Sequence, residues 1–316
     1  MKRKNKKKGN NLKIYLSVLV ALAVSYVFGV YKQTGLMTLP NLAPSVVETK
    51  SLEREPEKKV SDNRTGEKSM ALPAPLKKRD EHILHHKGYV VSYNSDWKIP
   101  NWVAWELTSK ETVARMERED TFCEDPDFRG PQATLADYRR SGYSRGHMVP
   151  AADMRWDKKA LEECFYLTNM CPQESAFNSG NWGKLERQCR EWAKQYGKLW
   201  VVCGPIVGKN PKHIGTGKVV VPSAFYKVIF VPHEKNPRAI GFIFAHRNKK
   251  GAKLREFMTT VDEVEQRTGI DFFASLPKSI EKKVESQCIA SQWRFFDEQK
   301  SGTRQNSYLG SKNKRH

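Results

Sequence analysis

The stretch Ser144-Arg145-Gly146-His147-Met148-Val149-Pro150 decides how this 316-residue chain is interpreted. Further along, the chain reads FYLTNMCPQ over residues 165–173, with Asn169 at its centre, and then presents Asn178 and Glu186. A histidine can take a proton from water, and amide or carboxylate oxygens can hold a hard cation or its bound waters. An arginine can meet a phosphate. The ordered set therefore predicts metal-assisted cleavage of phosphodiester bonds.

A helix is predicted over residues 180–196, and it carries part of this set. Apolar residues recur in it at intervals of three and four, and Gly197 ends it; they are Trp182, Leu185, Cys189 and Trp192. Glu186 lies about two turns beyond Asn178 and about 80° around the axis. Asn178 and Glu186 are therefore expected to flank one pocket that faces the loop carrying His147.

The remaining pattern favours strands that do not alternate regularly with helices. Alternation and β-branched or aromatic content predict strands at 89–93, 102–107, 199–203, 225–231 and 239–245. A second helix is predicted over 254–268. Since strict alternation is missing, a doubly wound parallel sheet is disfavoured, and we expect an α+β fold around a mainly antiparallel sheet.

The Arg-Gly-His segment with its downstream Asn and Glu residues resembles the DNA/RNA non-specific endonucleases of the ββα-metal class, the endonuclease G and Serratia types. The family signature is Asp-Arg-Gly-His, and Ser144 stands in place of the Asp. The resemblance covers roughly residues 89–290. The resemblance assigns a role to each residue. His147 would be the general base, Arg145 would contact the phosphate, and Asn169 would lie beside the base. Asn178 would bind the metal, and Glu186 would be the acid near the metal-bound waters.

This resemblance also implies a fold, a cofactor and partners. It implies the ββα-metal nuclease fold, with a central, mainly antiparallel sheet flanked by helices. It implies one Mg²⁺, for which Mn²⁺ can substitute, substrates of both DNA and RNA, and a homodimer as one assembly to expect. Arg118 is a candidate for a second phosphate contact, because the family has one nearby.

Two other functions remain open from the sequence. The Ser144 substitution is compatible with a nuclease-like domain that binds nucleic acid without cleaving it. The segment Gly142-Tyr143-Ser144-Arg145-Gly146 matches the G-x-S-x-G elbow of serine hydrolases. That elbow requires an apolar strand before it and a helix after it, whereas residues 135–140 are polar and Val149-Pro150 follows almost at once. A serine hydrolase is therefore the least favoured reading.

The ends of the chain differ in composition from its centre. Residues 1–35 begin with a Lys-rich cluster and continue with an apolar run over 14–31, which predicts a signal-anchor, or a cleaved signal peptide. Residues 36–88 are rich in Pro, Lys, Glu and Ser and are expected to form a flexible linker. The nuclease domain is expected over 89–290 and a basic tail over 291–316. The domain would then work outside the cytoplasm, anchored to a membrane or secreted.

The charge of the chain favours a polyanionic substrate, and the spacing of its cysteines does not favour a zinc site. The formal net charge is +20, from 55 Lys and Arg against 35 Asp and Glu, and the two ends carry twelve of the basic residues. A basic body suits a polyanionic substrate. None of the six cysteines forms a C-x-x-C pair, so zinc is disfavoured, while disulfides between some of them stay open. His82, His85 and His86 are expected to be a solvated run.

Overall fold

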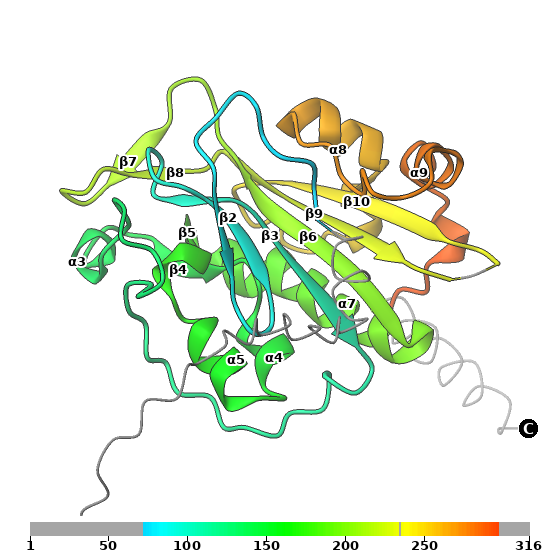
Figure 1. Cartoon of the computed structure of the whole chain (residues 1–316), viewed down its shortest axis with the longest axis horizontal. Helices are drawn as coiled ribbons and strands as arrows, with labels where there is room; N and C mark the ends of the chain where they lie inside the picture. The colour runs from blue at the N-terminus through cyan, green and yellow to red at the C-terminus, as the bar shows by residue number, and fades with distance from the viewer. Residues whose placement is uncertain (1–71, 234, 297–316) are drawn as a thin grey trace, which may run out of the picture. The chain divides into compact units, whose positions relative to one another are not determined.

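The computed structural model describes residues 72–233 and 235–296, which form seven antiparallel strands in one sheet with helices on both of its faces (Figure 1). The strand order is β1-β2-β3-β6-β9-β10-β11, and every neighbouring pair is antiparallel. The strands are β1 His82–His85, β2 Val90–Asn94, β3 Ile99–Thr108, β6 Lys198–Ile206, β9 Ala224–Val231, β10 Arg238–Ala245 and β11 Met258–Thr259. The predicted α+β fold with a mainly antiparallel sheet is thus confirmed.

Both faces of the central strands are buried, because helices cover each of them. Along β6, Leu199, Val201 and Cys203 pack into one core, whereas Trp200 and Val202 pack into the other. The first core includes the buried residues of α7 (Gly183–Tyr196), and the second includes those of α8 (Val261–Thr268) and α9 (Lys278–Glu285). The sheet therefore separates α7 from α8 and α9.

Shorter elements connect the strands. Two small antiparallel pairs lie outside the main sheet: β4 Ser144–His147 with β5 Met170–Gln173, and β7 Lys212–Ile214 with β8 Val219–Val221. The short helices are α3 Leu135–Tyr138, α4 Ala151–Met154, α5 Lys158–Glu163 and α6 Ser175–Phe177. The single-turn segments are η1 Leu167–Asn169, the π-helix η2 Asn178–Trp182, η3 Leu254–Phe257 and η4 Ala290–Gln292.

The helix predicted over 254–268 is wrong in its first half. Residues 254–257 form η3, Met258 and Thr259 pair with β10 as β11, and only 261–268 are α-helical. The Thr260 side chain accepts a hydrogen bond from the Glu263 amide (3.1 Å), which caps α8 and starts it afresh. The predicted helix 254–268 is therefore divided into η3, β11 and α8.

The domain extends beyond both predicted bounds. Within the predicted linker 36–88, β1 pairs with β2, and the Ala74 amide donates to the Asp271 carbonyl (2.8 Å). Within the predicted tail 291–316, Trp293 is 1% exposed and packs edge-on against Trp192 (centroids 4.8 Å apart). These segments are ordered because their apolar side chains reach the core. The predicted linker and tail therefore need correction at these ends, and residues 1–71, with the predicted signal-anchor, lie outside the described residues.

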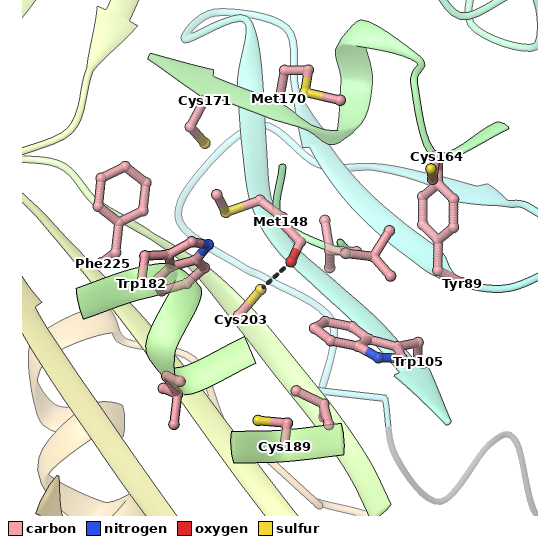
Figure 2. Packing of buried hydrophobic residues seen from close by; sticks show 14 of the residues in the cluster. Tyr89, Trp105, Met148, Cys164, Met170, Cys171, Trp182, Cys189, Cys203 and Phe225 are labelled. Atoms are coloured by element: carbon pink, nitrogen blue, oxygen red, sulfur yellow. Dashed lines mark hydrogen bonds between the residues drawn. The ribbon is translucent and has the colours of Figure 1, made fainter. Parts of the chain in front are cut away.

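All six cysteines fall within the described residues, and all are unpaired. Cys164, Cys171, Cys189 and Cys203 are buried, and in Figure 2 they lie among the aromatic and aliphatic side chains of the core. They act as small apolar residues there, so the disulfides left open by the sequence are not formed. In the same region, 72–233 and 235–296, the structure has no helix long and apolar enough to cross a bilayer.

Candidate active site

The predicted histidine is the last residue of strand β4. In the β4–β5 pair, Gly146 lies opposite Cys171 and His147 opposite Met170. A Cβ atom at Gly146 would come within 2.2 Å of the side chain of Gln173, which is itself fully buried. Glycine is therefore required beside the histidine because the buried Gln173 side chain fills the space that a larger residue would need.

Asn169 fixes the segment that follows His147. Its side-chain amide donates to the carbonyls of Val149 (3.0 Å) and Cys164 (2.8 Å), and its Oδ1 accepts from the Val149 amide (2.9 Å). Its backbone carbonyl accepts from the Met148 amide (3.0 Å), and the residue is 0% exposed. Asn169 therefore positions the segment that follows His147, in keeping with its expected place beside the base.

His147 is half-buried, in a pocket that favours its neutral form. Its ring lies edge-on to Phe165 (centroids 5.0 Å, planes at 88°) and 5.5 Å from Phe122, and its Nε2 is buried without a hydrogen-bond partner. Burial lowers the pKa of His147 to about 3, and the positive charges of Arg118 and Arg145 act in the same direction. The imidazole is therefore unprotonated at neutral pH, as a general base must be.

The two predicted phosphate contacts flank this histidine. The guanidinium of the exposed Arg145 stacks 4.0 Å from the Phe122 centroid, and that of Arg118 lies 5.5 Å from the Phe165 centroid. Arg118 also pairs with Asp120 (2.5 Å). Aromatic rings thus place both cations around His147. A neighbouring cavity of about 590 Å³ is lined by Phe122, Tyr138, Arg139, Tyr143 and Arg145, among others.

Asn178 begins the π-helical turn that leads into α7, in agreement with its predicted place at a helix start. Gly180 leaves helical geometry (ψ −111°), and a Cβ atom there would meet Asn248 at 2.3 Å. Asn248 Oδ1 accepts from the Asn181 amide (3.1 Å), which holds the turn against the loop that follows β10. Among the described residues the Asn178 side chain has no hydrogen-bond partner. A single π turn of this kind is frequent at functional sites.

Trp182 joins the turn to the histidine. Its indole Nε1 donates to the His147 carbonyl (3.3 Å), and its ring is fully buried. Figure 2 shows it beside Met148 and Cys203, where the Cys203 thiol donates to the Met148 carbonyl (3.2 Å). The start of α7 and the strand of His147 are therefore fastened to each other and to the sheet.

Glu186 lies one turn into α7 and forms no ion pair with any described residue. Burial raises the pKa of Glu186 to about 7, although Lys227 and Arg190 act to lower it. Its charge therefore depends on these two cations, neither of which was identified from the sequence.

The unexpected members of the site are Asp153, Arg190 and Lys227. Arg190 donates to Asp153 (2.8 Å), which also accepts from the Trp105 indole (3.2 Å). Lys227 is 0% exposed, and its ammonium lies 4.7 Å from the Trp105 ring and 4.4 Å from the Trp182 ring. Burial opposes its charge, but Cys203, Cys189, Glu186 and Asp153 raise its pKa above the ordinary value. The sequence signal that could have identified Lys227 is a lysine within the otherwise apolar strand 225–231.

Two other sequence interpretations are wrong. Ser144 opens β4, and its hydroxyl hydrogen-bonds to Ser175 (2.7 Å) without a histidine partner, so the serine hydrolase elbow is not formed.

His86 is not solvated, because it is 8% exposed and its Nε2 lies 3.1 Å from Asp125 Oδ2. Among residues 72–233 and 235–296, two clusters of three His, Asp or Glu side chains occur, His86/Asp125/Asp127 and Asp262/Glu265/Glu285, and neither includes Glu186.

The pair β4–β5 followed by α7, with a neutral histidine on the strand and an open Asn and Glu on the helix, defines a ββα-metal nuclease. The family described as DNA/RNA non-specific endonuclease matches residues 68–279. This chain therefore belongs to the DNA/RNA non-specific endonucleases.

Known proteins similar to this chain are nucleases. The chain is 35% identical over 232 residues to the mitochondrial nuclease EXOG of Danio rerio, covering 67% of this chain and 66% of that protein. It is 36% identical over 213 residues to nuclease C1 of Cunninghamella echinulata var. echinulata, covering 62% and 84%. A solved chain from the EndoG/EndoGI complex matches with a TM-score of 0.62 and 28% identity, covering 69% of this chain and 94% of that one.

We predict that Lys227→Met will lower nuclease activity at pH 7 by about tenfold, with recovery toward the parent activity near pH 9. Without the ammonium, the pKa of Glu186 rises further, and each unit costs up to tenfold in the ionised fraction. Steady-state pH–rate profiles measure this effect. Lys212→Met, at an exposed position of β7, is the matched control. A Lys227→Met profile identical to that of the parent would show that the buried ammonium does not act on Glu186.

Proposed function

We propose that this protein is a Mg²⁺-dependent endonuclease that cleaves DNA and RNA with little sequence preference. The observation that carries the proposal is the neutral His147 set between two arginines and fastened by Trp182 to the turn that carries Asn178. Contacts to phosphates carry no sequence information directly, so both nucleic acids fit such a site.

The free groups of the site fit a hard divalent cation. Among the described residues, neither the Asn178 amide nor the Glu186 carboxylate is used by a protein partner, and both offer oxygen. Mg²⁺ prefers oxygen ligands and retains several waters, so one direct protein ligand is sufficient. Asn178 would hold the ion and Glu186 would accept hydrogen bonds from its waters. When bound, the ion would supply Lewis-acid stabilisation of the phosphate and of the departing 3′ oxygen.

His147 provides the general base of the proposed reaction. Its Nε2 is enclosed, so Nδ1 is the nitrogen that would take the proton of the attacking water. The carbonyl of His147 is held by the Trp182 indole, and the segment after it is held by Asn169, so its backbone is fixed. Its ring is positioned by packing against Phe165 and Phe122. Arg145 would bind the scissile or adjacent phosphate, with Arg118 as a second contact.

The substrate itself would make His147 a stronger base. The two arginines add to burial in lowering the pKa of His147, and a bound phosphodiester would neutralise part of their positive field. The pKa of His147 would then rise toward the operating pH, where general-base catalysis is most effective. The base would thus be activated where the phosphate is bound.

We predict that His147→Ala will lose about 10²-fold to 10⁴-fold in cleavage rate at every Mg²⁺ concentration, because the general base is gone. Asn178→Ala should lose activity that is partly recovered at high Mg²⁺, because the loss is in ion binding. Plasmid nicking with the full chain, with and without EDTA, measures both effects, and His213→Ala on β7 is the control. Full activity in EDTA or in His147→Ala would rule the mechanism out, and no cleavage by the parent would favour the binding-only alternative.

We predict that binding weakens steeply with salt, and that Arg145→Met reduces the slope of log affinity against log salt by about one. Fluorescence anisotropy of labelled duplex DNA and RNA, with His147→Ala protein to prevent cleavage, gives this slope. Arg267→Met, on α8 across the sheet, is the control and should keep the parent slope. An unchanged slope in Arg145→Met would remove that residue from the phosphate contacts.

We also propose that residues 1–35 carry the domain out of the cytoplasm, by a signal-anchor or a cleaved signal, and that the segment up to residue 71 connects the two. The Lys-rich start and the apolar run over 14–31 support this. Fractionation of expressing cells should find the full chain in the membrane or exported fraction, and a variant lacking residues 1–35 in the cytoplasm. An intact full chain that is soluble in the cytoplasm would refute the proposal.

A further inference from the structure

Helices α8 and α9 lie side by side on the sheet face opposite α7 (Figure 1) and bring three carboxylates together. Asp262 and Glu265 are three residues apart on α8, so they share a face of that helix. Glu285 is the last residue of α9. Each of the three places a carboxylate oxygen within 4.8 Å of the other two. Three acidic side chains thus converge between two helices.

One carboxylate oxygen of Glu285 is buried without a hydrogen-bond partner among the described residues. This oxygen is Oε1, and the residue is 6% exposed. A buried polar atom in this state costs free energy unless a ligand satisfies it. The orphan oxygen is therefore an observation separate from the clustering of charge, and it indicates a missing partner.

No basic side chain neutralises the cluster. Lys278, which is on α9, is committed to Glu281 (2.7 and 2.8 Å), and Arg267, which is on α8, lies 3.8 Å from Glu263. Among the described residues no Lys or Arg pairs with Asp262, Glu265 or Glu285. The Phe272 amide donates a hydrogen bond to Glu265 Oε1 (2.7 Å).

Without a ligand, the cluster can be relieved only by protons. Burial raises the pKa of Glu265 to about 7 and that of Glu285 to about 8, and their acidic neighbours add to this shift. The neighbours are Asp262, Asp271 and Glu281. A divalent cation would replace the protons and satisfy the orphan oxygen as well.

We propose that Asp262, Glu265 and Glu285 form a Ca²⁺ site that joins α8 to α9. Ca²⁺ accepts several carboxylate ligands in a flexible geometry, whereas Mg²⁺ demands near-octahedral geometry and is usually held by one or two carboxylates. Three carboxylates that converge from two helices, with oxygens within 4.8 Å of one another, therefore suit Ca²⁺ better than Mg²⁺. Asp262 is exposed and gives the ion access from solvent. The site lies across the sheet from Asn178, so it does not rest on the proposed nuclease function.

The test is calorimetric titration of CaCl₂ into the EDTA-stripped full chain, with Asn178→Ala as background so that the proposed nuclease ligand does not contribute. We expect one Ca²⁺ per chain, weaker binding of Mg²⁺, and a rise in Tm of about 2–4 °C or more on saturation. Glu285→Gln should weaken Ca²⁺ binding by at least about tenfold and lose the Tm rise. Glu263→Gln, on α8 but outside the cluster, should keep both.

Three results would overturn the proposal. They are no heat of binding, the same Ca²⁺-dependent Tm rise in Glu285→Gln as in the parent, and equal affinity for Mg²⁺ and Ca²⁺. The first result, together with a Tm that rises as the pH is lowered, would assign the cluster to shared protons. Asp262→Asn changes an exposed residue and should also weaken Ca²⁺ binding, so the test holds even if Glu285→Gln fails to fold.

Discussion

The hydrogen bond from the Trp182 indole to the His147 carbonyl is the contact on which the site depends. It connects β4, which carries the base, to the π turn at the start of α7, which carries Asn178. A strand end and a helix start would otherwise move independently. Because Trp182 is also part of the core, the geometry of the site is set by the packing of the whole α7 face of the sheet.

That packing encloses charges, which is unusual in a core. The ammonium of Lys227 is fully buried between the indoles of Trp105 and Trp182. Arg190 of α7 pairs with the buried carboxylate of Asp153. Burying isolated ions is costly, and apolar residues of similar size would stabilise such a core at least as well. The charges are more simply explained by their effect on Glu186, whose pKa burial alone would raise further. The core beneath α7 is therefore shaped by the requirements of the site as well as by stability.

Local chemistry explains why much of the site was predictable. Arg145, His147, Asn178 and Glu186 stand at fixed spacings on one strand pair and one helix, and short-range spacing is readable from sequence. The five central strands were predicted for the same reason, since alternation is a local property. Lys227 and Asp153 come from different strands and helices, and only the tertiary fold brings them together beneath Glu186.

Errors arose where long-range contacts override local pattern. Residues 82–85 are too short and too polar to indicate a strand, yet pairing with β2 makes them one. Residues 258–259 continue an apparent helical stripe, yet β10 takes them as an edge strand. The role of Asn169 in holding the segment after His147 was not indicated by the sequence, because its partners are backbone groups of Val149 and Cys164. In each case the deciding partner is distant in sequence or is a backbone group that no side-chain pattern reveals.

The serine at position 144 bears on the same balance of charge. Its hydroxyl contacts Ser175 at the start of α6, so this position links β4 to the segment that leads into Asn178 without adding a charge. A carboxylate here would lie next to Arg145 and near His147, and it would oppose the effect of the arginines on the pKa of His147. With a neutral hydroxyl, the positive field around the imidazole is reduced by Asp120 but by no carboxylate at position 144. Arg145 stays exposed over Phe122, so its charge is available for a phosphate. The substitution therefore leaves more of the activation of the base to the substrate.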